Sequence, residues 1–111
     1  MTVGQWLARR TPRPPAALVR RVEDALGDSL ALDAHVAADA CLRSAELLVS
    51  ALLRSNSTTR ESALDLLTAD ALVTYAFEAA AESPVDLAPR AAQAMRRIAA
   101  LGAAQREGAT A

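Results

Sequence analysis

The stretch DAHVAADACLRSAELLVSALLR, residues 33–54, decides the fold class. Its apolar side chains recur at spacings of four and three residues, which is the rhythm of one face of an α-helix. Asp33 is a suitable N-cap, so the sequence predicts a long helix over about residues 33–54. Small residues fill the first half of this face and would let a second helix approach closely. The face consists of Ala34, Ala38, Cys41, Ala45, Leu48 and Leu52.

A second long helix is predicted over about residues 59–82. Ser57 or Thr58 together with Glu61 resembles a capping box that would begin it, and Ser83–Pro84 would end it. Its expected core face again has helical spacing and again includes small residues. That face consists of Leu66, Ala69, Val73, Ala76, Phe77 and Ala80.

Two further helices are predicted, one on each side of this pair. The first covers about residues 14–26 and ends at Gly27, a residue typical of helix C-termini. The second covers about residues 86–104. We expect its buried side to carry Ala91, Ala94, Met95, Ile98 and Leu101, and its outer side to carry Arg90, Arg96 and Arg97.

Length and composition agree with a single all-α domain. The chain has 111 residues, of which 52% are hydrophobic and only 3% aromatic, so it lacks the β-branched and aromatic content of a small β-domain. We therefore predict an antiparallel bundle of four long helices over residues 1–104, with a short helix around Trp6 at the N-terminus. Residues 105–111 are expected to form a flexible tail.

Several classes of protein are disfavoured by the same composition. A formal net charge of −1 argues against general binding to nucleic acid, and no run of about 18–20 apolar residues could span a membrane. With no signal-peptide pattern, the expected location is the cytoplasm. The single cysteine, Cys41, excludes an internal disulfide and a thiolate zinc site, so we expect no cofactor.

Two rows of polar residues are candidate sites. His35, Asp39 and Glu46 share one stripe of the 33–54 helix and could bind a metal, or could be a solvated face with Arg43 between them. Asp70, Thr74 and Glu78 form a second row, with Asp70 expected at the edge of the core, where Arg43 or the Tyr75 hydroxyl could pair with it. The candidate ligand or interface residues are Arg43, Glu46, Asp70, Thr74, Tyr75 and Glu78.

Signals for catalysis are missing from the chain. It contains no Gly-x-Ser-x-Gly elbow and no glycine-rich phosphate loop. A basic cluster near the N-terminus could contact an acidic partner or phosphates. It consists of Arg9, Arg10, Arg13, Arg20 and Arg21.

Residues 66–78, LLTADALVTYAFE, resemble a helix of the trans-isoprenyl diphosphate synthases, with Asp70-Ala71-Leu72 and Ala76-Phe77-Glu78 at matching spacing. Residues 45–52 are similar to a second segment of that family, and the resemblance covers about residues 34–105. It implies a packing like that of those synthases. The aspartate-rich motif that binds Mg²⁺ in the family is absent, because residues 53–60 read LRSNSTTR. The resemblance therefore implies a non-catalytic relative.

These observations favour a small non-enzymatic protein that acts by protein contact. The two central helices are apolar over more than one face, so we expect a homodimer or a larger homo-oligomer. The resemblance further implies that a catalytic subunit of the synthase type is a possible partner. The alternative is a binder of an isoprenoid or another lipid, held in an apolar cleft between the two central helices and rimmed by Arg43 and Asp70.

Overall fold

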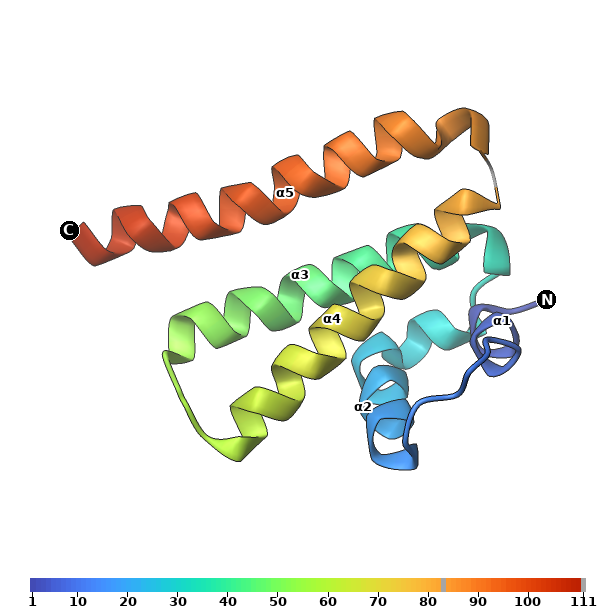
Figure 1. Cartoon of the computed structure of the whole chain (residues 1–111), viewed down its shortest axis with the longest axis horizontal. Helices are drawn as coiled ribbons and strands as arrows, with labels where there is room; N and C mark the ends of the chain where they lie inside the picture. Colours follow the sequence, from blue (N-terminus) through green and yellow to red (C-terminus); the bar gives the residue numbers. More distant parts are fainter. Residues whose placement is uncertain (83, 111) are drawn as a thin grey trace.

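The computed structural model describes residues 1–82 and 84–110, without the side chains of residues 84–87, 90 and 108–110. Over this range the chain is all-α, as predicted (Figure 1). Its α-helices are α1 (Val3–Ala8), α2 (Ala16–Leu26), α3 (Ala37–Ser55), α4 (Arg60–Ala81) and α5 (Pro84–Thr110). Two short 3-10 helices, η1 (Gly27–Ala31) and η2 (Ala34–Val36), connect α2 to α3.

The centre of the molecule is the antiparallel hairpin of α3 and α4 (Figure 1). Small side chains at the contact let the two helices pack tightly, because the interaxial distance depends on the residues between them. Ala45 and Ala69 are each 2% exposed, and Cys41 and Leu72 are fully buried. The predicted small-residue face of residues 33–54 is therefore confirmed as the core of the fold.

Helices α1 and α2 cover one side of the hairpin, and α5 covers part of the other side (Figure 1). Val22 and Leu26 of α2 and Trp6 of α1 belong to the buried core. The N-terminus is tied to the turn before α3 by two backbone hydrogen bonds, from the Val3 amide to the Leu32 carbonyl (2.8 Å) and from the Ala34 amide to the Met1 carbonyl (2.9 Å).

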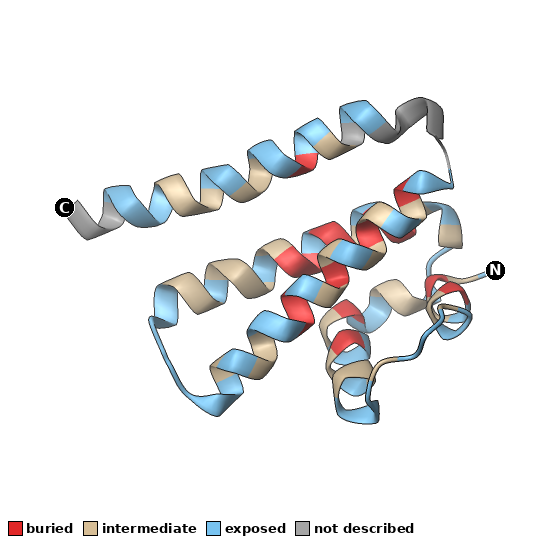
Figure 2. Cartoon of the chain, in the orientation of Figure 1, coloured by how far each residue is buried: buried red, intermediate tan, exposed pale blue. Residues whose placement is uncertain are grey.

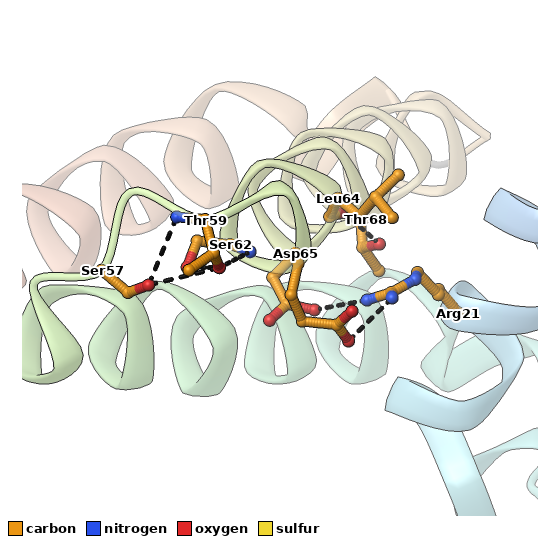
Figure 3. A network of polar contacts seen from close by, with 8 residues as sticks. Arg21, Ser57, Thr59, Ser62, Leu64, Asp65 and Thr68 are labelled. Carbon is orange, nitrogen blue, oxygen red and sulfur yellow. Dashed lines mark hydrogen bonds and ion pairs between the residues drawn. The ribbon is translucent and has the colours of Figure 1, made fainter.

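Two helix starts differ from the sequence-based predictions. Asp33 does cap a helix, accepting from the His35 amide, but that helix is the 3-10 turn η2, and α3 starts only at Ala37. Helix α4 is capped by Thr59, whose hydroxyl accepts from the Ser62 amide, rather than by Ser57 or Thr58 (Figure 3). The turn from α3 passes through left-handed Asn56, and Ser57 instead accepts from the Thr59 amide.

The last helix is longer than predicted. Residues 105–110, expected in the tail, continue α5 to Thr110. Alanine, glutamine, arginine and glutamate are good helix formers, so a helix can extend through residues 103–107. Residue 111 of the expected tail lies outside the described residues.

Candidate functional site

The six predicted site residues do not converge on one site. Arg43 and Glu46 lie on α3, whereas the other four lie on α4. Only Thr74, Tyr75 and Glu78 line a common groove, opposite the N-terminal segment. Arg43 and Asp70 are exposed. The rim that these two residues were expected to form around an apolar cleft is therefore not supported by the geometry.

Asp70 does not lie at the edge of the core, which corrects the sequence-based expectation. Its neighbour Ala69 faces α3 and is buried, while Asp70 is turned about 100° away and is exposed. The Thr74 hydroxyl donates to the backbone carbonyl of Asp70 at 3.0 Å, a bond within the helix. An exposed carboxylate needs no buried donor, so neither Arg43 nor Tyr75 is required as its partner.

Glu46 makes an ion pair that ties α5 to α3. Its carboxylate accepts a hydrogen bond from a terminal nitrogen of Arg97 at 3.0 Å, and the Nε of Arg97 lies 2.6 Å from its other oxygen. Arg97 was predicted to face outward, and this is wrong: the Arg97 side chain is 38% exposed and reaches back to α3. A long arginine can do this from the edge of an apolar helix face.

The stripe of His35, Asp39 and Glu46, which could have bound a metal or been a solvated face, is not formed as one helical row, because a 3-10 turn precedes α3. His35 lies in η2, and its ring nitrogen contacts the Asp33 carboxylate at 2.7 Å. The backbone amide and then the ring of His35 lower the pKa of Asp33 below its usual value. In the described part of the chain, no group of three or more histidine, cysteine, aspartate or glutamate residues is placed to hold a metal ion.

The groove around Tyr75 holds three of the six predicted residues. It has a volume of about 280 Å³ and runs between α4 and the proline-rich segment after α1. Burial, and then the nearby Glu78 carboxylate, raise the pKa of Tyr75, so the hydroxyl keeps its proton at neutral pH. The residues around the groove are Arg10, Thr11, Pro12, Arg13, Pro14, Ala71, Thr74, Tyr75 and Glu78.

An aromatic cluster lies beside this groove. The ring of Tyr75 meets Trp6 edge-on at 6.4 Å between centroids, and the guanidinium of Arg10 lies 4.3 Å from the centre of the Trp6 ring. Glu82 accepts a hydrogen bond from the Trp6 indole at 2.9 Å and lies 3.6 Å from Arg10. The predicted list omitted Trp6 and Arg10, although their four-residue spacing at a helix end would have placed them on one face.

The basic cluster of the N-terminal region is partly neutralised within the chain. Arg21 of α2 donates to Asp65 and Glu61 of α4, both at 2.8 Å (Figure 3). These two carboxylates raise the pKa of Arg21. Arg10 shares Glu82 with Trp6, so two of the five arginines are committed to internal contacts.

No reactive thiol is present in the core. Cys41 is fully buried in α3, and burial raises the pKa of its thiol to about 12. A thiol in this state is neither a nucleophile nor a metal ligand at neutral pH. No helix in the described part of the chain has both the length and the apolar character needed to cross a membrane.

Several apolar side chains beyond the contact between α5 and the hairpin are incompletely covered. Leu42 of α3 and Phe77 of α4 line a small pocket beneath Ala94 of α5. Leu53 and Leu66 lie eleven residues away on the same faces of α3 and α4, since eleven residues make just over three helical turns. Leu53 is half-buried and Leu66 is 60% exposed. We call Leu53, Leu66, Ile98 and Leu101 the distal surface.

Helix α5 itself is thinly packed. Ala94 is the one buried side chain among those described on this helix, and Ile98 and Leu101 are half-buried (Figure 2). Met95, predicted to be buried, is 61% exposed. It follows Ala94 directly and is therefore turned about 100° away from the hairpin.

Comparison with known proteins found no matching family model, no matching curated protein and no matching solved structure. Function must therefore be argued from the geometry of this chain.

Proposed function

We propose that this protein is a non-enzymatic helical module that forms a homodimer through its distal surface. The observation that carries the proposal is excess exposed area. A compact monomer of 11.6 kDa exposes roughly 5,800 Å². This chain exposes 7095 Å², roughly 1,250 Å² more than that.

The size of the excess matches a protein interface. Each partner in a standard complex buries about 800 Å², which is less than the excess surface of this chain. The elongated shape agrees, because the principal extents are 46 × 33 × 23 Å and the radius of gyration is 14.4 Å, against about 13 Å for a compact domain of this length.

The chemistry of the open surface suits a second copy. Leu53 and Leu66 are apolar residues on the two helices of the hairpin, and Ile98 and Leu101 are apolar residues on the thinly packed α5. In a twofold dimer, α5 of one copy can lie on the hairpin of the other, and both copies then bury the same residues. The arrangement uses apolar contact alone and needs no cofactor.

The lipid-binding alternative has less support. The faces of α3 and α4 that were expected to line a cleft meet each other directly, with Ala45, Ala69 and Leu72 at 2% exposure or less. Small residues at this contact bring the helices together rather than opening a channel.

Sedimentation velocity over a roughly hundredfold range of protein concentration tests the dimer. We expect a dimer that dissociates on dilution. Leu66→Asp and Leu101→Asp should each shift the protein to the monomer, because a charge in an apolar interface must be desolvated. Leu47→Asp is the matched control, since Leu47 is exposed to 63%, almost as Leu66 is, but faces away from the α5 side of α3.

Circular dichroism shows whether each variant keeps its helices. A wild-type chain that stays monomeric at every concentration would overturn the proposal. So would equal loss of the dimer in all three variants, since the distal surface would then have no special role.

A further inference from the structure

We infer that the turn between α3 and α4 is a phosphorylation site, with Thr58 as the acceptor for a serine/threonine protein kinase. The modification itself does not depend on self-association. Its consequence, a weakened dimer, rests on the function proposed above, because the turn adjoins the distal surface. Exposure, the state of the hydroxyl groups, two flanking arginines and a neighbouring groove all support this role.

The turn is the most accessible stretch of the chain. Residues 54–61 are all exposed, and no other run of exposed residues in the described part of the chain is as long. Thr58 belongs to no helix, and its amide and carbonyl make no hydrogen bond to the rest of the described backbone. Such a residue can enter the groove of an enzyme without the unfolding of a packed helix.

The hydroxyl groups of the turn differ in how they are used. Those of Ser57 and Ser62 lie within hydrogen-bond distance of the Thr59 hydroxyl, at 3.3 and 3.1 Å (Figure 3). The Ser55 hydroxyl donates to a backbone carbonyl of α3 at 3.1 Å. The Thr58 hydroxyl makes no hydrogen bond within the described part of the chain. Its oxygen can therefore react without the loss of a helix cap.

Two arginines flank the acceptor. Arg54 lies four residues before Thr58, and Arg60 lies two residues after it. Arg54 donates to the Ser50 hydroxyl at 2.7 Å, and neither guanidinium forms an ion pair with another described residue. Arg21, by contrast, is paired with two carboxylates. Unpaired positive charge beside an acceptor suits a kinase whose substrate groove is acidic, because kinases select substrates partly by charge pattern.

The reaction is the transfer of the γ-phosphoryl group of ATP. The Thr58 hydroxyl oxygen forms the new bond to phosphorus, the bond between the γ-phosphorus and its bridging oxygen breaks, and ADP leaves. The hydroxyl proton goes to the catalytic base of the kinase. The product carries about −1.5 to −2 charges at pH 7, whereas the unmodified threonine carries none.

The new charge lies at the edge of the distal surface. Thr58 lines a groove of about 290 Å³ together with Leu52 of α3 and Leu66 of α4. Leu66 belongs to the distal surface, and the proposed dimer buries it. A phosphate beside this leucine must lose water when a second copy binds, and the twofold symmetry brings a second phosphate to the same interface. Phosphorylation therefore favours the monomer.

Incubation of the folded chain with ATP, Mg²⁺ and a purified arginine-directed serine/threonine kinase tests the site. Intact-mass spectrometry should show one added phosphoryl group per chain, and fragmentation should place it on Thr58. Thr58→Val should abolish the transfer, whereas Ser57→Ala, which removes the neighbouring hydroxyl, should retain it. A standard peptide substrate shows that the kinase is active under the same conditions.

Sedimentation velocity then tests the effect on the dimer. The phosphorylated chain should dimerise about tenfold more weakly than the unmodified chain. Thr58→Glu should show part of this loss, and Thr58→Gln, which has a similar size but no charge, should show none. Thr11→Glu makes the same change at an exposed threonine of the N-terminal segment and should leave the dimer intact.

The two measurements fail separately. No transfer to the folded chain by an active kinase, or transfer that persists in Thr58→Val, would overturn the phosphorylation site. Unchanged self-association after phosphorylation of a dimeric wild type would overturn the regulation and leave the dimer in place. A wild type that stays monomeric would overturn the dimer and its regulation together, while the mass measurement still decides the site.

Discussion

The α3–α4 hairpin and α5 are both rich in alanine and leucine, but only the hairpin buries these residues. Cys41, Ala45, Ala69 and Leu72 lie at the contact of α3 and α4 with 2% exposure or less. On α5, Ala94 alone reaches this kind of burial among the described side chains (Figure 2). The two regions therefore have similar compositions but differ in how closely a neighbouring helix covers their apolar faces.

The difference shows what an alanine-rich face needs in order to form a core. Small side chains contribute little apolar area each, so they stabilise a contact only when a second small face approaches closely enough for dispersion contacts along the whole length. Helices α3 and α4 provide this for each other. Helix α5 meets the hairpin near Leu42 and Phe77 and leaves Leu66 uncovered.

The largest effect should come from deleting a core side chain in the hairpin. Leu72 is fully buried, so Leu72→Ala should lower the free energy of unfolding by about 2–5 kcal/mol. Ile98→Ala on α5 should cost only about 1 kcal/mol in the monomer, because Ile98 is half-buried. Urea denaturation followed by circular dichroism at low protein concentration measures both.

Protein concentration sharpens this comparison. If α5 is covered by a second copy, the cost of Ile98→Ala should grow at concentrations where the dimer forms, while the cost of Leu72→Ala should change little. Equal costs for the two substitutions at low concentration would show that α5 is as firmly packed as the hairpin.

A smaller effect is expected from adding carbon atoms at the same two contacts. Ala69→Leu inserts a branched side chain between α3 and α4 and should destabilise the protein by about 1–3 kcal/mol. The thermal midpoint should fall by roughly 5–15 °C for a domain of this length. Ala99→Leu adds the same atoms on exposed α5 and should stay within about 0.5 kcal/mol of the wild type. Calorimetry of the two variants measures both effects. An unchanged stability of Ala69→Leu would mean that α3 and α4 are not closely packed at this position.

Much of the fold could be predicted from spacing alone. The rhythm of Ala38, Cys41 and Ala45 identified the buried face of α3, because helical periodicity and burial are linked directly. The short N-terminal helix and the end of α2 at Gly27 followed from local signals. The spacing of apolar residues does not reveal the direction in which each neighbouring helix runs. Leu66 and Phe77 share one face of α4, and only the course of α5 decides that Phe77 is covered and Leu66 is not.

The candidate site was harder to predict for a related reason. Asp70, Thr74 and Glu78 were chosen as a row on one helix, and the structure brings Thr74 and Glu78, but not Asp70, to a single groove with Tyr75. Their partners Arg10 and Arg13 come from a segment more than 60 residues away, and no local pattern links the two. The placement of His35 was predicted wrongly for a local reason. A regular helix was assumed to begin at Asp33, whereas a 3-10 turn there shifts His35 off the stripe.

The smallest effect should come from the ion pair that ties α5 to the hairpin. Glu46 and Arg97 are 20% and 38% exposed, so their attraction is partly screened by water. A double-mutant cycle with Glu46→Gln and Arg97→Gln should give a coupling energy of about 0.5–1 kcal/mol. That energy should shrink as salt is raised.

Each single variant should also speed amide exchange along α5 while leaving the α3–α4 hairpin protected, because the pair bridges α3 and α5 and no other element. Faster exchange in the hairpin as well would mean that α5 belongs to the same cooperative unit. The two regions would then differ only in the apolar area that each buries.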